Sequence, residues 1–169
     1  MIKQYLQRGF LYFIYIFASL WISLIISLPS VLLSRFKFPM GSVEENVIIT
    51  VIMTVVMCFS MYFFTHRLGY GDREFNLKQI LIPIAFALVL QFVYAAIFSF
   101  AVYASGPARF LGDIVYLLNG GDNKGVPSSF VVPWMLVFDA FYVGVALLGN
   151  YRGVRKREKD RDKLLSEKK

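Results

Sequence analysis

Charged residues are scarce in this chain of 169 amino acids, and it has only one cysteine and one histidine. Charged residues make up 17% of the chain, whereas a soluble domain carries about 25%. Hydrophobic residues make up 57%. A soluble fold of this size could not enclose that much apolar surface, because much of a small protein's area stays exposed. The sequence therefore predicts an integral membrane protein in contact with a lipid bilayer.

The rarity of reactive side chains argues against catalysis. The single cysteine, Cys58, excludes an internal disulfide, and its apolar neighbours indicate a buried, unreactive thiol. The single histidine, His66, has no partners at the spacing of a zinc site. A serine hydrolase needs a histidine near its serine, and an intramembrane aspartyl protease needs two carboxylates in its spans. We therefore expect no enzyme activity, cofactor or bound metal.

Four stretches are long and apolar enough to cross a bilayer, since a span needs about 20 predominantly apolar residues. Every backbone donor and acceptor must be satisfied within a span, so helices are expected, and the runs do not alternate as strands of a barrel would. The first run is about twice as long as a signal-peptide core, so we interpret it as a retained span. The predicted spans are residues 9–34, 46–65, 79–105 and 129–151.

The distribution of Lys and Arg predicts the orientation. With both ends in the cytoplasm, fourteen Lys and Arg lie on the inner side and four on the outer side. This is a clear positive-inside bias, and it requires an even number of crossings. The four outer residues are Arg35, Lys37, Arg109 and Lys124. The plain architecture further suggests a bacterial inner (plasma) membrane.

Two segments outside the spans have a character of their own. Residues 108–118 mix apolar and polar side chains over a length too short to span, with Pro107 at the first helical position. Residues 152–169 form a basic cytoplasmic tail that is expected to continue the fourth helix for some turns. The net charge of +7 is concentrated there, which favours contact with anionic headgroups over nucleic acid.

The predicted fold is therefore all-α. A bundle of four transmembrane helices, with a short amphipathic helix on its outer surface, occupies residues 1–151, and the tail follows it.

Asp139 is the strongest functional signal, because it is a charged residue near the centre of the fourth span. A charge at that depth costs at least ~2.5–3.5 kcal/mol, and such residues usually face the bundle interior. The other spans place Gln91, Thr54 and Ser23 near the same depth. If all four side chains point inward, they form a polar layer that would bind a substrate or ion.

Packing is the alternative interpretation of the same polar residues. Hydroxyl and small residues at steps of three and four are typical of seams between membrane helices. The serines of the first span follow such steps, and Ala140 and Gly144 form a small-xxx-small pair. Asp139 itself would then make a structural hydrogen bond, within the bundle or to another subunit.

Two classes of function remain open. The first is a small transporter or channel-type protein, or a subunit of one, with its polar site around Asp139. Because four helices enclose little volume, it would act as a homo-oligomer or within a larger membrane complex. The second is a non-catalytic accessory or assembly subunit, whose inner loop and basic tail contact a partner.

Overall fold

The computed structural model describes residues 2–72, 74–97, 106–121 and 126–167. This part of the chain contains five helices and no strand. The helices are α1 (Ile2–Ser34), α2 (Val43–Gly71), α3 (Leu77–Ile97), α5 (Pro107–Leu118) and α6 (Ser128–Ser166). The last part of the predicted third span, residues 98–105, lies outside the described residues, as do Arg73 and Lys124.

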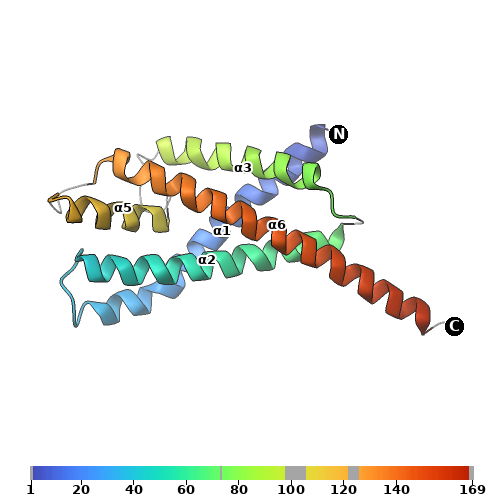
Figure 1. Ribbon diagram of the computed structural model, residues 1–169, viewed down its shortest axis with the longest axis horizontal. Coiled ribbons are helices and arrows are strands. Elements are labelled where there is room, and N and C mark those ends of the chain that lie inside the picture. Colours follow the sequence, from blue (N-terminus) through green and yellow to red (C-terminus); the bar gives the residue numbers. More distant parts are fainter. Residues whose placement is uncertain (1, 73, 98–105, 122–125, 168–169) are drawn as a thin grey trace.

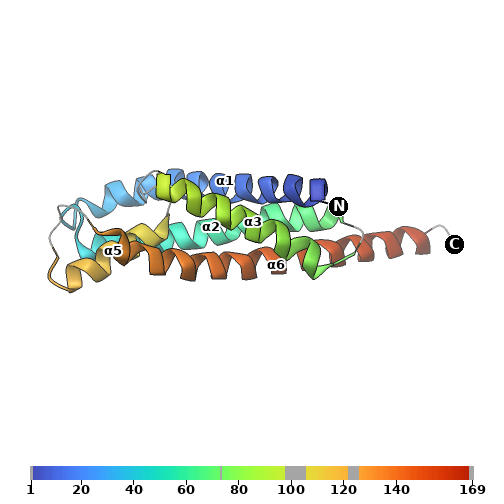
Figure 2. The same cartoon turned by 90° about the horizontal axis from the view of Figure 1, so that it is seen from above.

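The four long helices run side by side along the long axis of the molecule (Figures 1 and 2). In the contacts between them, α1 packs against α2 and α3, and α2 packs against α6. Both termini lie at the same end, which we call the termini end (Figure 1). The α1–α2 turn and α5 lie at the opposite end, which we call the loop end. This arrangement agrees with an even number of crossings.

The four long helices have the length and apolar composition of membrane spans, with mean hydropathies of 2.0 to 2.5 in their most apolar windows. Their outward faces carry large apolar side chains that are more than half exposed, among them Ile25, Phe59, Val89 and Phe141. Such continuous apolar surfaces are stable in lipid rather than in water. The protein is therefore a four-helix membrane bundle, as the sequence predicts.

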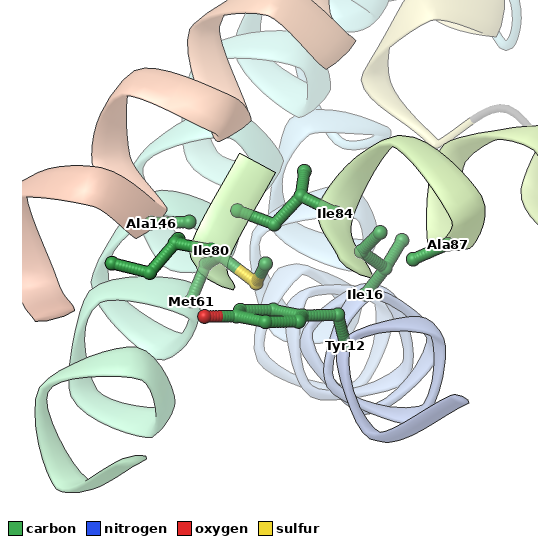
Figure 3. Close-up of a cluster of buried hydrophobic side chains, with 7 residues drawn as sticks. All are labelled: Tyr12, Ile16, Met61, Ile80, Ile84, Ala87 and Ala146. Carbon is green, nitrogen blue, oxygen red and sulfur yellow. The ribbon is translucent and has the colours of Figure 1, made fainter. Parts of the chain in front are cut away.

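Side chains from all four long helices meet in the interior (Figure 3). Each contributing residue is buried on the inward stripe of its helix, at the spacing of three and four that places side chains on one face. This core positions the polar residues discussed below. The cluster comprises Tyr12, Ile16, Met61, Ile80, Ile84, Ala87 and Ala146.

The predicted amphipathic segment is helix α5, with Pro107 in its first turn. Its buried face includes Ala108, Gly112 and Ile114, and it packs against α2 and α6 at the loop end. At Gly112 an added Cβ would lie 2.9 Å from the backbone oxygen of Phe130, so the start of α6 approaches α5 closely.

A capped turn joins α1 to α2 at the loop end. Gly41 has a φ of 75°, in the left-handed region that favours glycine. Ser42 caps α2, its hydroxyl accepting a hydrogen bond from the Glu45 backbone N–H at 3.2 Å. The buried Glu45 carboxylate accepts from the Gly41 N–H at 2.5 Å and from Arg35 Nε at 3.3 Å. The Ser42 cap fixes where α2 begins, and Glu45 holds the preceding turn against the helix.

Glycines bring α2 and α6 together at the termini end. A Cβ added at Gly69 would meet the backbone of Asn150, and one added at Gly153 would meet the His66 carbonyl. A Cβ at Gly149 would meet the Thr65 hydroxyl. We call these three glycines the glycine seam. Close backbone approach through small residues is the usual packing mode of membrane helices.

Helix α6 continues without a break past residue 151 to Ser166, which confirms the helical continuation predicted for the tail. Residues 168 and 169 lie outside the described part. The tail also contacts the α2–α3 connection, since the Arg157 guanidinium donates to the Asp72 carbonyl at 2.7 Å. Asp72 in turn forms an ion pair with Arg8 of α1.

Candidate functional site

Asp139 lies on the inward stripe of α6, with only 6% of its surface exposed. Met135 and Tyr142, one turn on either side, are buried on the same stripe. The stripe continues through Ala146 to the glycine seam, so the packing that joins α6 to α2 also sets the rotation of α6. The carboxyl group is thereby turned into the bundle and away from lipid.

Gln91 is the hydrogen-bonding partner of Asp139. It is buried on α3, one turn from Ala87 and Ala95, which are fully buried. Its Nε2 donates to Asp139 Oδ1 at 3.2 Å, while its Oε1 has no hydrogen-bond partner among the described residues. None of the ion pairs within the described ranges includes Asp139. Among the described residues, the buried carboxyl is therefore held by one amide and by no basic side chain.

A small cavity adjoins this pair. Its volume is about 10 Å³, close to the minimum that holds one water molecule. Tyr142 lines it as well and donates its hydroxyl to Met57 Sδ at 3.3 Å. The space can hold one water molecule. The lining residues are Ile16, Phe17, Leu20, Met57, Gln91, Gly106, Met135, Phe138, Asp139 and Tyr142.

The other two predicted site residues do not join the pair. The Thr54 hydroxyl donates to the Thr50 carbonyl at 2.7 Å, and the Ser23 hydroxyl donates to the Leu20 carbonyl at 2.7 Å. Each hydroxyl thus donates to a backbone carbonyl of its own helix, as Ser and Thr hydroxyls often do in membrane spans. Neither residue lines the cavity. Of the four side chains expected to form a polar layer, Asp139 and Gln91 form a hydrogen-bonded pair, while Thr54 and Ser23 bond within their own helices.

A second buried polar contact lies nearer the termini end. Asn150 is 1% exposed, and its Nδ2 donates to the Tyr12 hydroxyl at 2.8 Å and to the Ala146 carbonyl at 2.9 Å. Asn150 is not a predicted site residue, because it lies at the edge of the predicted fourth span. Its position three helical turns beyond Asp139, on the same stripe, is the signal that would have found it.

The small-xxx-small pair Ala140 and Gly144 does not form a seam within this bundle. Both residues are exposed, and a Cβ added at Gly144 would meet nothing within 4 Å. The close packing predicted for this pair has no partner helix among the described residues and stays a prediction. The internal seam uses Gly149 and Gly153, which have the same spacing.

These features define a helical, multi-pass membrane protein with one buried carboxyl–amide pair between two of its spans. Comparison of the chain with protein-family models, with curated proteins and with solved structures found no match. Its function is therefore argued from the site itself.

Proposed function

We propose that Asp139 and Gln91 form the proton-binding site of a small transport protein, or of a subunit of one. The observation that carries this proposal is a buried carboxyl group whose only hydrogen-bond partner within the described ranges is an amide. A carboxylate without a counterion is costly in an apolar surrounding, so it must take up a proton or pair with a cation.

The chemistry of Gln91 supports a proton over a metal cation. An amide offers both a donor and an acceptor. It can donate to ionised Asp139, as in the structure, and after an amide flip its Oε1 can accept from protonated Asp139. A metal cation would require several more oxygen ligands, and the cavity of about 10 Å³ is otherwise lined mainly by apolar side chains.

The experiment compares proton flux through purified protein in vesicles that carry a pH-sensitive dye. Asp139→Asn removes the proton site at nearly constant volume and should abolish flux. Asp162→Asn makes the same change on the tail, where the Asp162 side chain is 69% exposed, and should leave flux unchanged. Equal flux in Asp139→Asn and the wild type, with both variants inserted and monodisperse, would contradict the proposal.

We further propose that both termini are cytoplasmic in a bacterial inner membrane and that the tail lies near anionic headgroups. The excess of Lys and Arg at the termini end supports this orientation. A membrane-impermeant thiol reagent applied to intact cells should fail to label Ser166→Cys in a Cys58→Ser background. Labelling without permeabilisation would reverse the assignment.

A second candidate function is that of an assembly subunit without transport. It is favoured by the exposed pair Ala140 and Gly144, which offers α6 a close-packing surface for a helix of another subunit. Gly144→Leu should then change the oligomeric state or release a co-purifying partner. Val55→Leu, on the exposed face of α2, should not. Identical elution profiles for both variants would remove this candidate.

A further inference from the structure

A groove of about 560 Å³ lies at the loop end, between α1, α2 and α5. Trp21, Ile25 and Leu28 of α1 line it and remain 49%, 62% and 55% exposed. The deeper wall includes Ile49 and Met53 of α2, which are buried. The groove is therefore largely apolar and opens sideways onto the surface that faces lipid.

The length of the groove matches one leaflet of a bilayer. Its apolar lining follows α1 from Trp21 to Val31, about 15 Å at a rise of 1.5 Å per residue. The hydrocarbon core of a bilayer is about 30 Å thick, so one leaflet contributes about 15 Å. An acyl chain of the leaflet at the loop end would thus find an apolar channel of its own length.

Charged and amide side chains also line the groove. They are Arg35, Glu45 and Asn46 at the capped turn and Asp113 on α5. Arg35 is 45% exposed and already donates to Glu45, and Asp113 of α5 pairs with Arg109 at 3.2 Å. Each carboxylate of the lining therefore has a cationic partner, Arg35 for Glu45 and Arg109 for Asp113, so this part of the groove carries charges of both signs.

Asn46 gives independent support for a bound polar group. It is 5% exposed, and its side-chain amide makes no hydrogen bond to any described residue, although its carbonyl accepts from Thr50 at 2.8 Å. Since the amide lines the groove, a ligand there would supply the missing partners.

The ionisation of Asp113 depends on the charge of the group that occupies the groove. Burial raises the pKa of the Asp113 carboxyl, and the neighbouring Arg109 opposes that shift. Its Oδ1 is buried and lacks a hydrogen bond of good geometry within the described part of the chain. A cationic group in the groove would stabilise the ionised carboxylate.

We propose that this groove binds a zwitterionic phospholipid of the loop-end leaflet. One acyl chain lies along the apolar lining, the phosphate accepts from Arg35 and Asn46, and the headgroup ammonium donates to Asp113. A purely anionic headgroup satisfies the first two donors but faces the carboxylates of Glu45 and Asp113. Charge complementarity therefore selects the zwitterion.

The test is native mass spectrometry of the full-length protein in a mild detergent. Synthetic phosphatidylethanolamine and phosphatidylglycerol with identical acyl chains are added separately. The wild type should retain the phosphatidylethanolamine about tenfold better, the value of one charge-assisted hydrogen bond. Equal retention, better retention of phosphatidylglycerol, or no retained lipid would overturn the proposal, and this comparison requires no variant to fold.

Variants then locate the lipid. Asp113→Asn should lose the preference, because it removes the ammonium partner and leaves Arg109 unpaired. Asn46→Leu should weaken the binding of both lipids, because it removes an amide that donates a hydrogen bond to the phosphate. Asp162→Asn, the same change as Asp113→Asn on the exposed tail, should behave as the wild type. A preference that survives Asp113→Asn would contradict the assigned site.

A second measurement reports the acyl chain. Phosphatidylethanolamine with brominated chains, added at equimolar amount in detergent, should quench Trp21, which lines the groove. The quenching should disappear in Trp21→Phe, where Trp134 is the only remaining tryptophan. Quenching that is the same in Trp21→Phe and the wild type would place the chain elsewhere.

Discussion

Helices α2 and α6 meet differently at the two ends of the bundle. At the termini end the glycine seam brings their backbones into direct contact. At the loop end α5 contacts both helices, and Figure 1 shows it beside them at that end only. The groove and the Asp139 cavity both include residues of the loop-end half. Side-chain size along two helices thus decides where the bundle is closed and where it can hold a ligand.

The comparison also separates two uses of buried polar groups. Asn150, at the closed end, donates to Tyr12 and to its own helix, and so joins α6 to α1. Asn46, at the open end, has no partner for its amide among the described residues and lines a groove. Hydrogen bonds between membrane helices contribute only about 0.6 kcal/mol on average. The seam is therefore expected to stabilise the fold more than any single polar pair.

The largest effect is expected from Gly149→Ala, which breaks the seam. The added methyl group would collide with the Thr65 hydroxyl and lie 2.9 Å from the Tyr62 carbonyl. Overpacking of this kind costs about 1–3 kcal/mol, and contact with backbone places this site at the upper end. Thermal unfolding can be followed in detergent by thiol-reactive dye labelling of Cys58, the only cysteine.

Gly144→Ala is the matched control for that variant. It makes the same change five residues earlier on α6, where nothing lies within 4 Å of the new methyl group. Its melting temperature should equal or slightly exceed that of the wild type, because Ala is the better helix former. Equal losses in both variants would show that the seam does not join α2 to α6.

A smaller effect is expected from Tyr12→Phe, which removes the hydroxyl that accepts from Asn150 at 2.8 Å. The loss should lie between about 0.6 kcal/mol, the average for a hydrogen bond between membrane helices, and about 1.7 kcal/mol, the largest such value. Tyr151→Phe changes an exposed tyrosine of α6 and should have little effect. In a double-mutant cycle with Asn150→Ala, additive losses would disprove the contact.

The smallest effect is expected at the ion pair between Arg8 and Asp72, whose side chains are 28% and 16% exposed. Partly exposed ion pairs contribute at most about 1 kcal/mol and are screened by salt. Arg8→Gln should lower the melting temperature slightly in low salt, and the difference should vanish in high salt. A large decrease in melting temperature that salt does not reduce would show that Arg8 contributes through packing instead of charge.

The spans and α5 were predictable from the sequence because apolar run length and Pro107 act locally. The rotation of each helix about its own axis could not be predicted in the same way. Ala140 with Gly144 and Gly149 with Gly153 have identical spacing, and only the opposite position of Gly69 on α2 decides which pair faces inward.

The depth of a residue in its predicted span did not identify all of the site residues correctly. Thr54 and Ser23 lie near the middle of their predicted spans, yet each hydroxyl bonds to its own helix. The partnership of Gln91 with Asp139 was expected, because long side chains that carry both donors and acceptors reach across to a neighbouring helix. The groove was not expected, since it depends on how α5 packs rather than on any one segment.

The continuity of α6 has a mechanical consequence. Its 39 residues extend about 58 Å, roughly twice the hydrocarbon thickness of a bilayer, and no hinge separates Asp139 from the tail. The seam at Gly149 and Gly153 lies between them and joins α6 to α2. A tilt of α6 that follows a change of charge at Asp139 would therefore swing the tail as a lever arm. A spin label at Ser166 would register events that occur deep in the membrane.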